Sequence, residues 1–168
     1  NAATCTIANT AIAPTLTLVK RVSNNFGGTA VPTDWTLTGT GPVTISGASG
    51  SDPVTAAVVQ TGDYNLSESG GPGGYTAGDW NCGAADLTGS TVTVPLDSNI
   101  TCTIVNSDQP AQLTLVKVVD ANNSGSTKQP SEWTLTATPQ GITGQDEVSG
   151  NGDPTSADGV NAVQVFAG

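Results

Sequence analysis

The sequence is poor in the residues on which most enzymes and nucleic-acid-binding proteins depend. It has no His and no Met, and only four of its 168 residues are Lys or Arg. Without His, the chain lacks the commonest general base, the commonest metal ligand and the usual physiological pH switch. Fourteen Asp and Glu residues bring the formal net charge to −10, which disfavours binding to nucleic acid or to anionic lipid surfaces. No apolar run reaches the roughly 18 residues of a transmembrane helix, so we expect no membrane insertion. From the lack of His and the negative charge we expect no conventional enzyme, metal site, cofactor or nucleic-acid partner.

The residues that are abundant favour strands and turns. Charged residues make up only 11% of the chain, whereas there are 21 Gly and 10 Pro. Turn-forming clusters recur at intervals of about 8–12 residues, with short alternating runs of apolar and polar residues between them. No segment keeps the apolar period of about 3.6 residues that indicates a helix. The pattern predicts an all-β protein, an immunoglobulin-like β-sandwich with about seven strands in each unit.

The chain repeats itself with a period of about 97 residues. Cys5 and Cys102 are 97 positions apart, and so are Lys20 and Lys117. Three pairs of near-identical segments carry the repeat: 4–7 and 101–104, 16–20 and 113–117, and 34–38 and 132–136. Ordered self-similarity of this kind indicates a tandem array of structural units.

The register of the repeat predicts how the chain divides. Residues 1–9 match the last strand of a preceding unit, residues 14–108 form one complete unit, and residues 112–168 form the first half of the next. Pro14 and Pro110 lie at the joints, where proline favours a short, extended and stiff connection. Because the sequence shows neither an initiating Met nor a signal-like segment, we expect a segment of a longer product.

Three strands of the complete unit are predicted to turn a polar side chain into the core. Side chains alternate across a strand, so residues two positions apart share a face. The three shared faces are Leu16, Leu18 and Lys20; Tyr64, Leu66 and Glu68; and Cys102, Ile104 and Asn106. An unpaired buried charge is too costly to keep, and we therefore expect Lys20, Glu68 and Asn106 to meet.

These strands resemble the Cna protein B-type repeat domains, SpaA-like sandwiches of the prealbumin-like fold that form stalks and pilins of bacterial surface proteins. The resemblance rests on Tyr64-Asn-Leu-Ser-Glu68 followed by Pro72-Gly-Gly-Tyr75, together with the strands that carry Lys20 and Asn106. In that family an intramolecular isopeptide bond joins the first-strand Lys to the last-strand Asn, and a Glu promotes it. The resemblance therefore implies a Lys20–Asn106 bond with Glu68 in the catalytic role.

The implied chemistry requires these residue types. Burial lowers the pKa of a Lys and raises the pKa of a Glu, so that a neutral amine can stand beside a protonated carboxyl. The amine can attack the Asn carbonyl while the carboxyl polarises it and shuttles the proton that leaves with ammonia. The reaction would occur once, as a self-modification rather than a turnover. A buried Lys–Glu pair with the Asn as a capping hydrogen-bond partner, and no covalent bond, is the alternative for the same residues.

Two of the three cysteines are predicted to form a disulfide. Cys82 shares a strand face with Trp80, and Cys102 shares one with Ile104. A bridge between them would close a loop of about 20 residues, which contributes roughly 3 kcal/mol of stability. Such a bridge is not typical of the stalk family, and it places the chain outside the cytosol. Zinc binding is the alternative, although two thiols without a His make a poor zinc site.

The incomplete units carry counterparts of these residues. Asn9 corresponds to Asn106 and Lys117 corresponds to Lys20, while Cys5 corresponds to Cys102. We expect the disulfide partner of Cys5 to lie in the preceding unit. Trp35 and its counterpart Trp133 alternate with Leu residues along their strands, which predicts two core positions rather than ligand platforms.

The sequence thus predicts a structural component of a secreted or bacterial cell-surface fibre, stalk or pilus-like filament. Its partners would be neighbouring repeats or further copies of itself. Tension that enters near Pro14 and leaves near Pro110 would pass through a Lys20–Asn106 bond and bypass the core. Two alternatives remain: an adhesin module whose loops bind a host or surface glycan, and a subunit that polymerises by strand donation through its N-terminal strand.

Overall fold

The computed structural model describes residues 3–122 and 124–166, and the chain divides into two compact units. The first unit comprises residues up to Ser23 together with Ala30–Ser107, and the second comprises Asn24–Thr29 together with the chain from Asp108 onward. Each unit is built from strands and short 3-10 turns. No helix among the described residues is long and apolar enough to cross a membrane.

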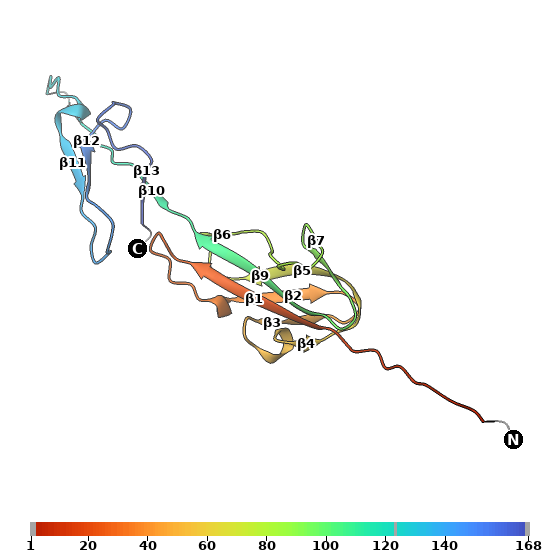
Figure 1. The fold of residues 1–168 in the computed structure, drawn as a ribbon. Coiled ribbons are helices and arrows are strands. Elements are labelled where there is room, and N and C mark those ends of the chain that lie inside the picture. The colour runs from red at the N-terminus through yellow and green to blue at the C-terminus, as the bar shows by residue number, and fades with distance from the viewer. Residues whose placement is uncertain (1–2, 123, 167–168) are drawn as a thin grey trace. The chain divides into compact units, whose positions relative to one another are not determined.

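The first unit is a sandwich of two sheets, as the alternating sequence pattern predicts (Figure 1). The first sheet has the order β4 (Ala57–Val58), β1 (Thr15–Ser23), β9 (Asn99–Asp108) and β6 (Tyr75–Ala77). The second has the order β3 (Ile45–Ala48), β2 (Trp35–Thr40), β5 (Gly62–Gly70), β8 (Thr91–Val94) and β7 (Leu87–Thr88). The sheets hold nine strands where about seven were predicted, because β4 and β7 are edge strands of two residues each, too short to show an alternating pattern.

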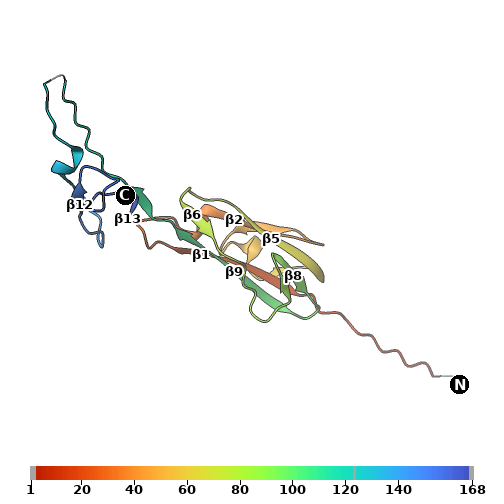
Figure 2. The same cartoon turned by 90° about the horizontal axis from the view of Figure 1, so that it is seen from above.

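The first and the last strand of this unit lie side by side and run parallel (Figures 1 and 2). β1 and β9 pair over nine consecutive positions, with Lys20 opposite Ile104 and Val22 opposite Asn106. The pairs β1–β4, β2–β3, β2–β5, β5–β8 and β7–β8 are antiparallel. Because β1 and β9 point the same way, the chain reaches the unit at one end of this strand pair and leaves it at the other.

The core lies between the two sheets and follows the predicted alternation. The fully buried residues include Leu16, Leu18, Tyr64 and Cys102, and Leu66 and Ile104 are nearly so. Trp35 is also buried, which confirms its predicted core position. A 3-10 turn, η1 (Pro32–Asp34), delivers Trp35 to the start of β2, and a second one, η2 (Asp52–Val54), follows β3.

The second unit contains two separate strand pairs. β10 (Ala111–Leu113) pairs with β13 (Val163–Val165). The turn η3 (Pro130–Glu132) precedes the second pair, which joins β11 (Thr134–Ala137) to β12 (Val148–Asn151). Val160, which is 2% exposed, is the one buried hydrophobic residue among those described in this unit. Residues 123, 167 and 168 of the predicted half-repeat lie outside the described residues.

Several local contacts of the first unit recur in the second. In each, a Thr hydroxyl bonds a Ser hydroxyl across two antiparallel strands, and a second Thr hydroxyl accepts the N–H of an Ala that has a positive φ. The pairs are Thr38–Ser46 (2.8 Å) and Thr136–Ser149 (3.0 Å), and Ala56–Thr17 (2.9 Å) and Ala162–Thr114 (3.0 Å). The repeated sequence thus makes repeated local structure.

Candidate functional site

Three strands bring the predicted polar residues together inside the sandwich. Lys20 on β1 and Asn106 on β9 come from one sheet, and Glu68 on β5 comes from the other. The Lys20 side chain is 0% exposed and that of Glu68 is 15% exposed, while Asn106 is buried. The strand alternation that fills the core with Leu and Ile therefore also carries these three groups into it.

One carboxylate contacts both of the other groups. Lys20 Nζ lies 2.5 Å from Glu68 Oε2, and Asn106 Nδ2 donates a hydrogen bond of 2.8 Å to Glu68 Oε1. No hydrogen-bond donor among the described residues reaches the buried Oδ1 of Asn106. The sequence predicted a contact between the carboxyl and the Asn carbonyl; the carboxylate instead contacts the amide nitrogen, the group that would leave as ammonia.

The environment of Lys20 lowers the pKa of its amine. Burial is the largest influence and lowers the pKa of Lys20 below its ordinary value of 10.5, against the hydrogen bond and the negative charge of Glu68, which raise it. A buried Lys near one carboxylate thus loses its proton more readily than an exposed one. This is the protonation state in which an amine is a nucleophile.

Trp35 completes the surroundings of Lys20, and the sequence did not predict this contact. Lys20 Nζ lies 4.7 Å from the centroid of the Trp35 ring. Trp35 also packs edge-on against Tyr75, with the ring centroids 5.5 Å apart. The alternation of β2 predicts that Trp35 faces the core, but which core neighbour it meets depends on how the two sheets are placed over each other.

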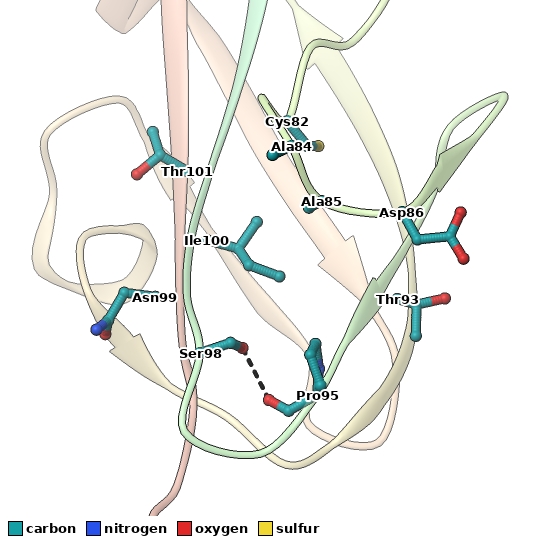
Figure 3. Close-up of a pocket in the computed structure, with 10 residues that line it drawn as sticks. All are labelled: Cys82, Ala84, Ala85, Asp86, Thr93, Pro95, Ser98, Asn99, Ile100 and Thr101. Carbon is teal, nitrogen blue, oxygen red and sulfur yellow. Dashed lines mark hydrogen bonds between the residues drawn. The ribbon is translucent and has the colours of Figure 1, made fainter.

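The predicted disulfide is confirmed: Cys82 is bonded to Cys102. The bond attaches β9 to the segment that follows β6, where the N–H and C=O of Asn81 both bond with Thr103 (2.9 and 2.8 Å). Beside it lies an open cavity of about 390 Å³ (Figure 3), with Cys82, Ala84 and Ala85 along one side and Ile100 along another. Cys102 and Asn106 both belong to β9 and lie four residues apart, on the same face of the strand.

The counterparts in the incomplete units occupy different surroundings. Cys5 and Asn9 are exposed in the segment before β1, which contains no strand among its described residues, and Cys5 forms no disulfide. Residues 1 and 2 of the predicted strand lie outside the described residues. Lys117 is half-buried, and its Nζ lies 5.1 Å from the centroid of the Trp133 ring.

Asp108 is a second buried charge that the sequence did not single out. It is the last residue of β9, and its carboxylate accepts the backbone N–H groups of Asn25 (2.7 Å), Phe26 (2.7 Å) and Gly28 (2.9 Å). Burial raises the pKa of Asp108, but these hydrogen bonds outweigh it, and the pKa lies below its ordinary value. The continued i, i+2 alternation of β9 past Asn106 is the signal that could have revealed it.

Comparison with known families agrees with this architecture. The family model of a SpaA-type prealbumin-like fold domain matches residues 12–104 and 108–168. A search of curated proteins and a search of solved structures each returned no match. The two matched segments together cover most of the chain.

Proposed function

Because the chain belongs to the SpaA-type prealbumin-like fold family, we propose that it is a structural segment of an extracellular stalk, fibre or pilus-like filament at a bacterial cell surface. In this proposal Lys20 and Asn106 become joined by an intramolecular isopeptide bond. The contact of Glu68 with both residues is the observation that carries it. The family is structural, and the only chemistry we propose is this single self-modification.

The proposed reaction uses the three contacts directly. Lys20 Nζ, in its neutral form, attacks Cγ of Asn106; a C–N bond forms, the Cγ–Nδ2 bond breaks, and ammonia leaves. One proton of the amine passes through the Glu68 carboxyl to the departing nitrogen, so atoms and charge balance. Glu68 is suited to this transfer because it contacts both the attacking and the leaving nitrogen (2.5 and 2.8 Å).

A second orientation of the Asn106 amide would give Glu68 a role during the attack, before its contact with Nδ2 serves the proton transfer. A half-turn of the amide exchanges Nδ2 and Oδ1, and a protonated Glu68 would then donate a hydrogen bond to Oδ1, which otherwise lacks a donor among the described residues. Such a bond stabilises the negative charge that develops on the oxygen during attack. Holding amine, amide and acid in one buried cluster also replaces a collision of separate molecules with a preorganised contact.

The parallel arrangement of β1 and β9 gives the bond a mechanical role. Tension applied through Pro14 and Pro110 pulls β1 and β9 in opposite directions along their shared ladder. With the bond in place, the force passes from Lys20 directly to Asn106, and the residues between them carry no load. The Cys82–Cys102 disulfide lies inside this bypassed stretch, so we assign it to the stability of the fold and not to the path of the force.

We further propose that the chain is part of a tandem array with a unit of about 97 residues. The recurring Thr–Ser and Ala–Thr hydrogen bonds support this. In this array residues 1–9 are the last strand of a preceding unit, 14–108 a complete unit and 112–168 the first half of the next. Lys117 would be the bond-forming Lys of its own unit, and Cys5 and Asn9 would belong to the unit before.

Single-molecule stretching of the whole chain between its termini tests the mechanical proposal. The wild-type chain and the variant Asn106→Ala are compared under oxidising conditions. Asn106→Ala should show one additional extension step on the order of 200 Å, the contour length that the missing bond releases when the disulfide stays closed. The same step in the wild-type chain would overturn the proposal.

Assembly by strand donation is a second candidate, and the exposure of Ile7 favours it. Ile7 is 89% exposed, whereas its repeat counterpart Ile104 is buried in β9. A strand with this pattern could pair with a unit of another copy. Light scattering across a concentration series should then show association, and removal of residues 1–9 should abolish it. A monomer at all concentrations would contradict donation.

A further inference from the structure

The cross-linking cluster contains a fourth member that does not react. We propose that Trp35 is a positioning residue for the isopeptide reaction: its indole face seals the Lys20 amine from water and holds it against Glu68. This inference rests on the proposed cross-link. It gives a reason for the contact between Trp35 and the Lys20 amine, which packing in the core does not require. The ring lies over Nζ at 4.7 Å from its centroid, within the range of a cation–π contact.

The ring is fixed from several sides. The turn η1 comes directly before Trp35 in the chain. A hydrogen bond from the N–H of Val31 to Asp34 Oδ2 (2.9 Å) closes this turn and so fixes the backbone that leads into Trp35. Tyr75 packs edge-on against the indole. Gly71 lies so close that a Cβ at this position would be 2.2 Å from Trp35 Cε2 and Nε1, and its φ of +81° disfavours any other residue. A ring held in this way can act as a rigid wall.

The Lys–Trp contact does not depend on the other two members of the cluster. In the second unit Lys117 Nζ lies 5.1 Å from the centroid of Trp133, after the matching turn η3. The described residues of that unit include no strand corresponding to β5 or β9, which carry Glu68 and Asn106 in the first unit. Lys117 follows β10, and its N–H donates to the C=O of Gly152 (2.8 Å), whose own N–H donates to the C=O of Trp133 (2.8 Å). The Lys–Trp contact therefore forms in this unit without the acid and the amide.

The wall has two opposing electrostatic effects on Lys20. It excludes water, which disfavours the ammonium form, and its π face attracts an ammonium, which favours that form. Burial is the largest influence on the pKa of Lys20 and lowers it, so the proposal takes exclusion of water by the indole as the larger effect. The titratable groups around the amine are Glu68 from β5 and, beyond the indole, Tyr75 from β6; the carboxylate of Asp108 on β9 is bound by the 25–28 loop.

The kinetic test follows the loss of ammonia in unreacted chain. Chain made by chemical synthesis and kept in denaturant is refolded across a pH series, and the intact mass is read at timed intervals. Trp35→Phe keeps an aromatic wall and should react within about threefold of the wild-type rate. Trp35→Leu should react at least tenfold more slowly at neutral pH, with the rise in rate moved to higher pH; Trp133→Leu, the matched control, should behave as wild type. A slower Trp35→Leu reaction with an unmoved pH profile would show a merely structural role and overturn the inference.

A second readout separates this inference from the cross-link itself. In the Asn106→Ala background no bond can form, and the three Lys side chains can be titrated by NMR with Lys117 as an internal reference. Trp35→Leu should raise the Lys20 pKa. If Trp35→Leu does not fold, Gly71→Ala, which pushes the indole aside, should shift the Lys20 pKa in the same direction. Gly74→Ala carries the same backbone strain (φ +84°), but its Cβ would meet nothing within 4 Å, and it should not shift the pKa. An unshifted Lys20 pKa overturns the role of Trp35, whereas retention of ammonia by the wild-type chain overturns the cross-link.

Discussion

Lys20 and Asn106 lie on neighbouring parallel strands, two positions out of register, and the carboxylate of Glu68 touches both. In a parallel pair the residue opposite Lys20 is Ile104, so Asn106 lies two positions further along the same face. A Lys side chain is long enough to cover that offset, and Glu68 reaches the pair from the opposite sheet. The amine and the amide are thus held together by backbone register and joined through one acid.

Removal of the acid should slow the proposed reaction strongly while leaving the fold intact. We expect Glu68→Gln to slow the loss of ammonia by a factor on the order of 10²–10⁴, because the amide cannot carry the proton between the two nitrogens. The intact mass of freshly refolded chain measures this. Glu132→Gln, which changes an exposed Glu of the second unit, serves as the control and should react at the wild-type rate. Equal rates for both variants would remove Glu68 from the mechanism.

The choice of Lys is equally testable. Lys20→Arg keeps a positive charge but cannot act as the nucleophile at any ordinary pH, so this variant should retain the full mass. Lys117→Arg alters the equivalent Lys, which faces Trp133 in the second unit, and should lose ammonia as the wild type does. A loss of ammonia from Lys20→Arg would place the reaction elsewhere in the chain.

The disulfide should stabilise the first unit independently of the isopeptide bond. In the Asn106→Ala background, where unfolding is not limited by the covalent link, the double variant Cys82→Ala/Cys102→Ala should lower the free energy of unfolding by roughly 3 kcal/mol, the value for a closed loop of about 20 residues. Denaturant titration measures the change. Cys5→Ala, which removes an exposed free thiol, should have no effect; a comparable loss in both variants would argue against a stabilising bridge.

Asp108 predicts a pH dependence at the acidic end. Its pKa is lower in the folded protein than its ordinary value of 3.8, so the stability that it contributes is present above that value and is lost as the pH falls through the lower, folded pKa. Asp108→Asn should therefore reduce stability by roughly 1–3 kcal/mol at neutral pH and flatten this acidic decline. Denaturant unfolding at a series of pH values measures both effects.

The comparison for Asp108 is Asp79→Asn, at an exposed position. This variant should leave both the neutral stability and the acidic decline as they are in the wild type. If the two variants behave alike, the backbone hydrogen bonds from Asn25, Phe26 and Gly28 are not the source of the pH dependence.

The parts of the site that could be predicted are those set by strand alternation. Alternation is local, so it placed Lys20, Glu68 and Asn106 on inward faces, and the pairing of Cys82 with Cys102 followed from the same reasoning together with the repeat. The resemblance to the stalk family supplied the proposed bond between the first and the last strand, whose parallel pairing the structure describes.

What could not be predicted depends on contacts between distant elements. The position of Trp35 over Lys20 requires the relative placement of two sheets, and the capping of the 25–28 loop by Asp108 requires two strand ends to lie at the same edge. The two-residue strands β4 and β7 have no pattern of their own and exist because a longer neighbour offers them hydrogen bonds. The orientation of the Asn106 amide is a further case, since it depends on which of its two ends meets Glu68.

The intact mass of the folded wild-type chain, measured under denaturing conditions with the disulfide closed, tests the proposed Lys20–Asn106 bond itself. We predict a mass lower than the sequence requires, after allowance for the disulfide, by one molecule of ammonia, and a peptide map in which the β1 and β9 fragments stay joined after the disulfide is reduced. The full sequence mass, with separate β1 and β9 fragments after reduction, would contradict the bond and leave Lys20, Glu68 and Asn106 as a hydrogen-bonded core cluster.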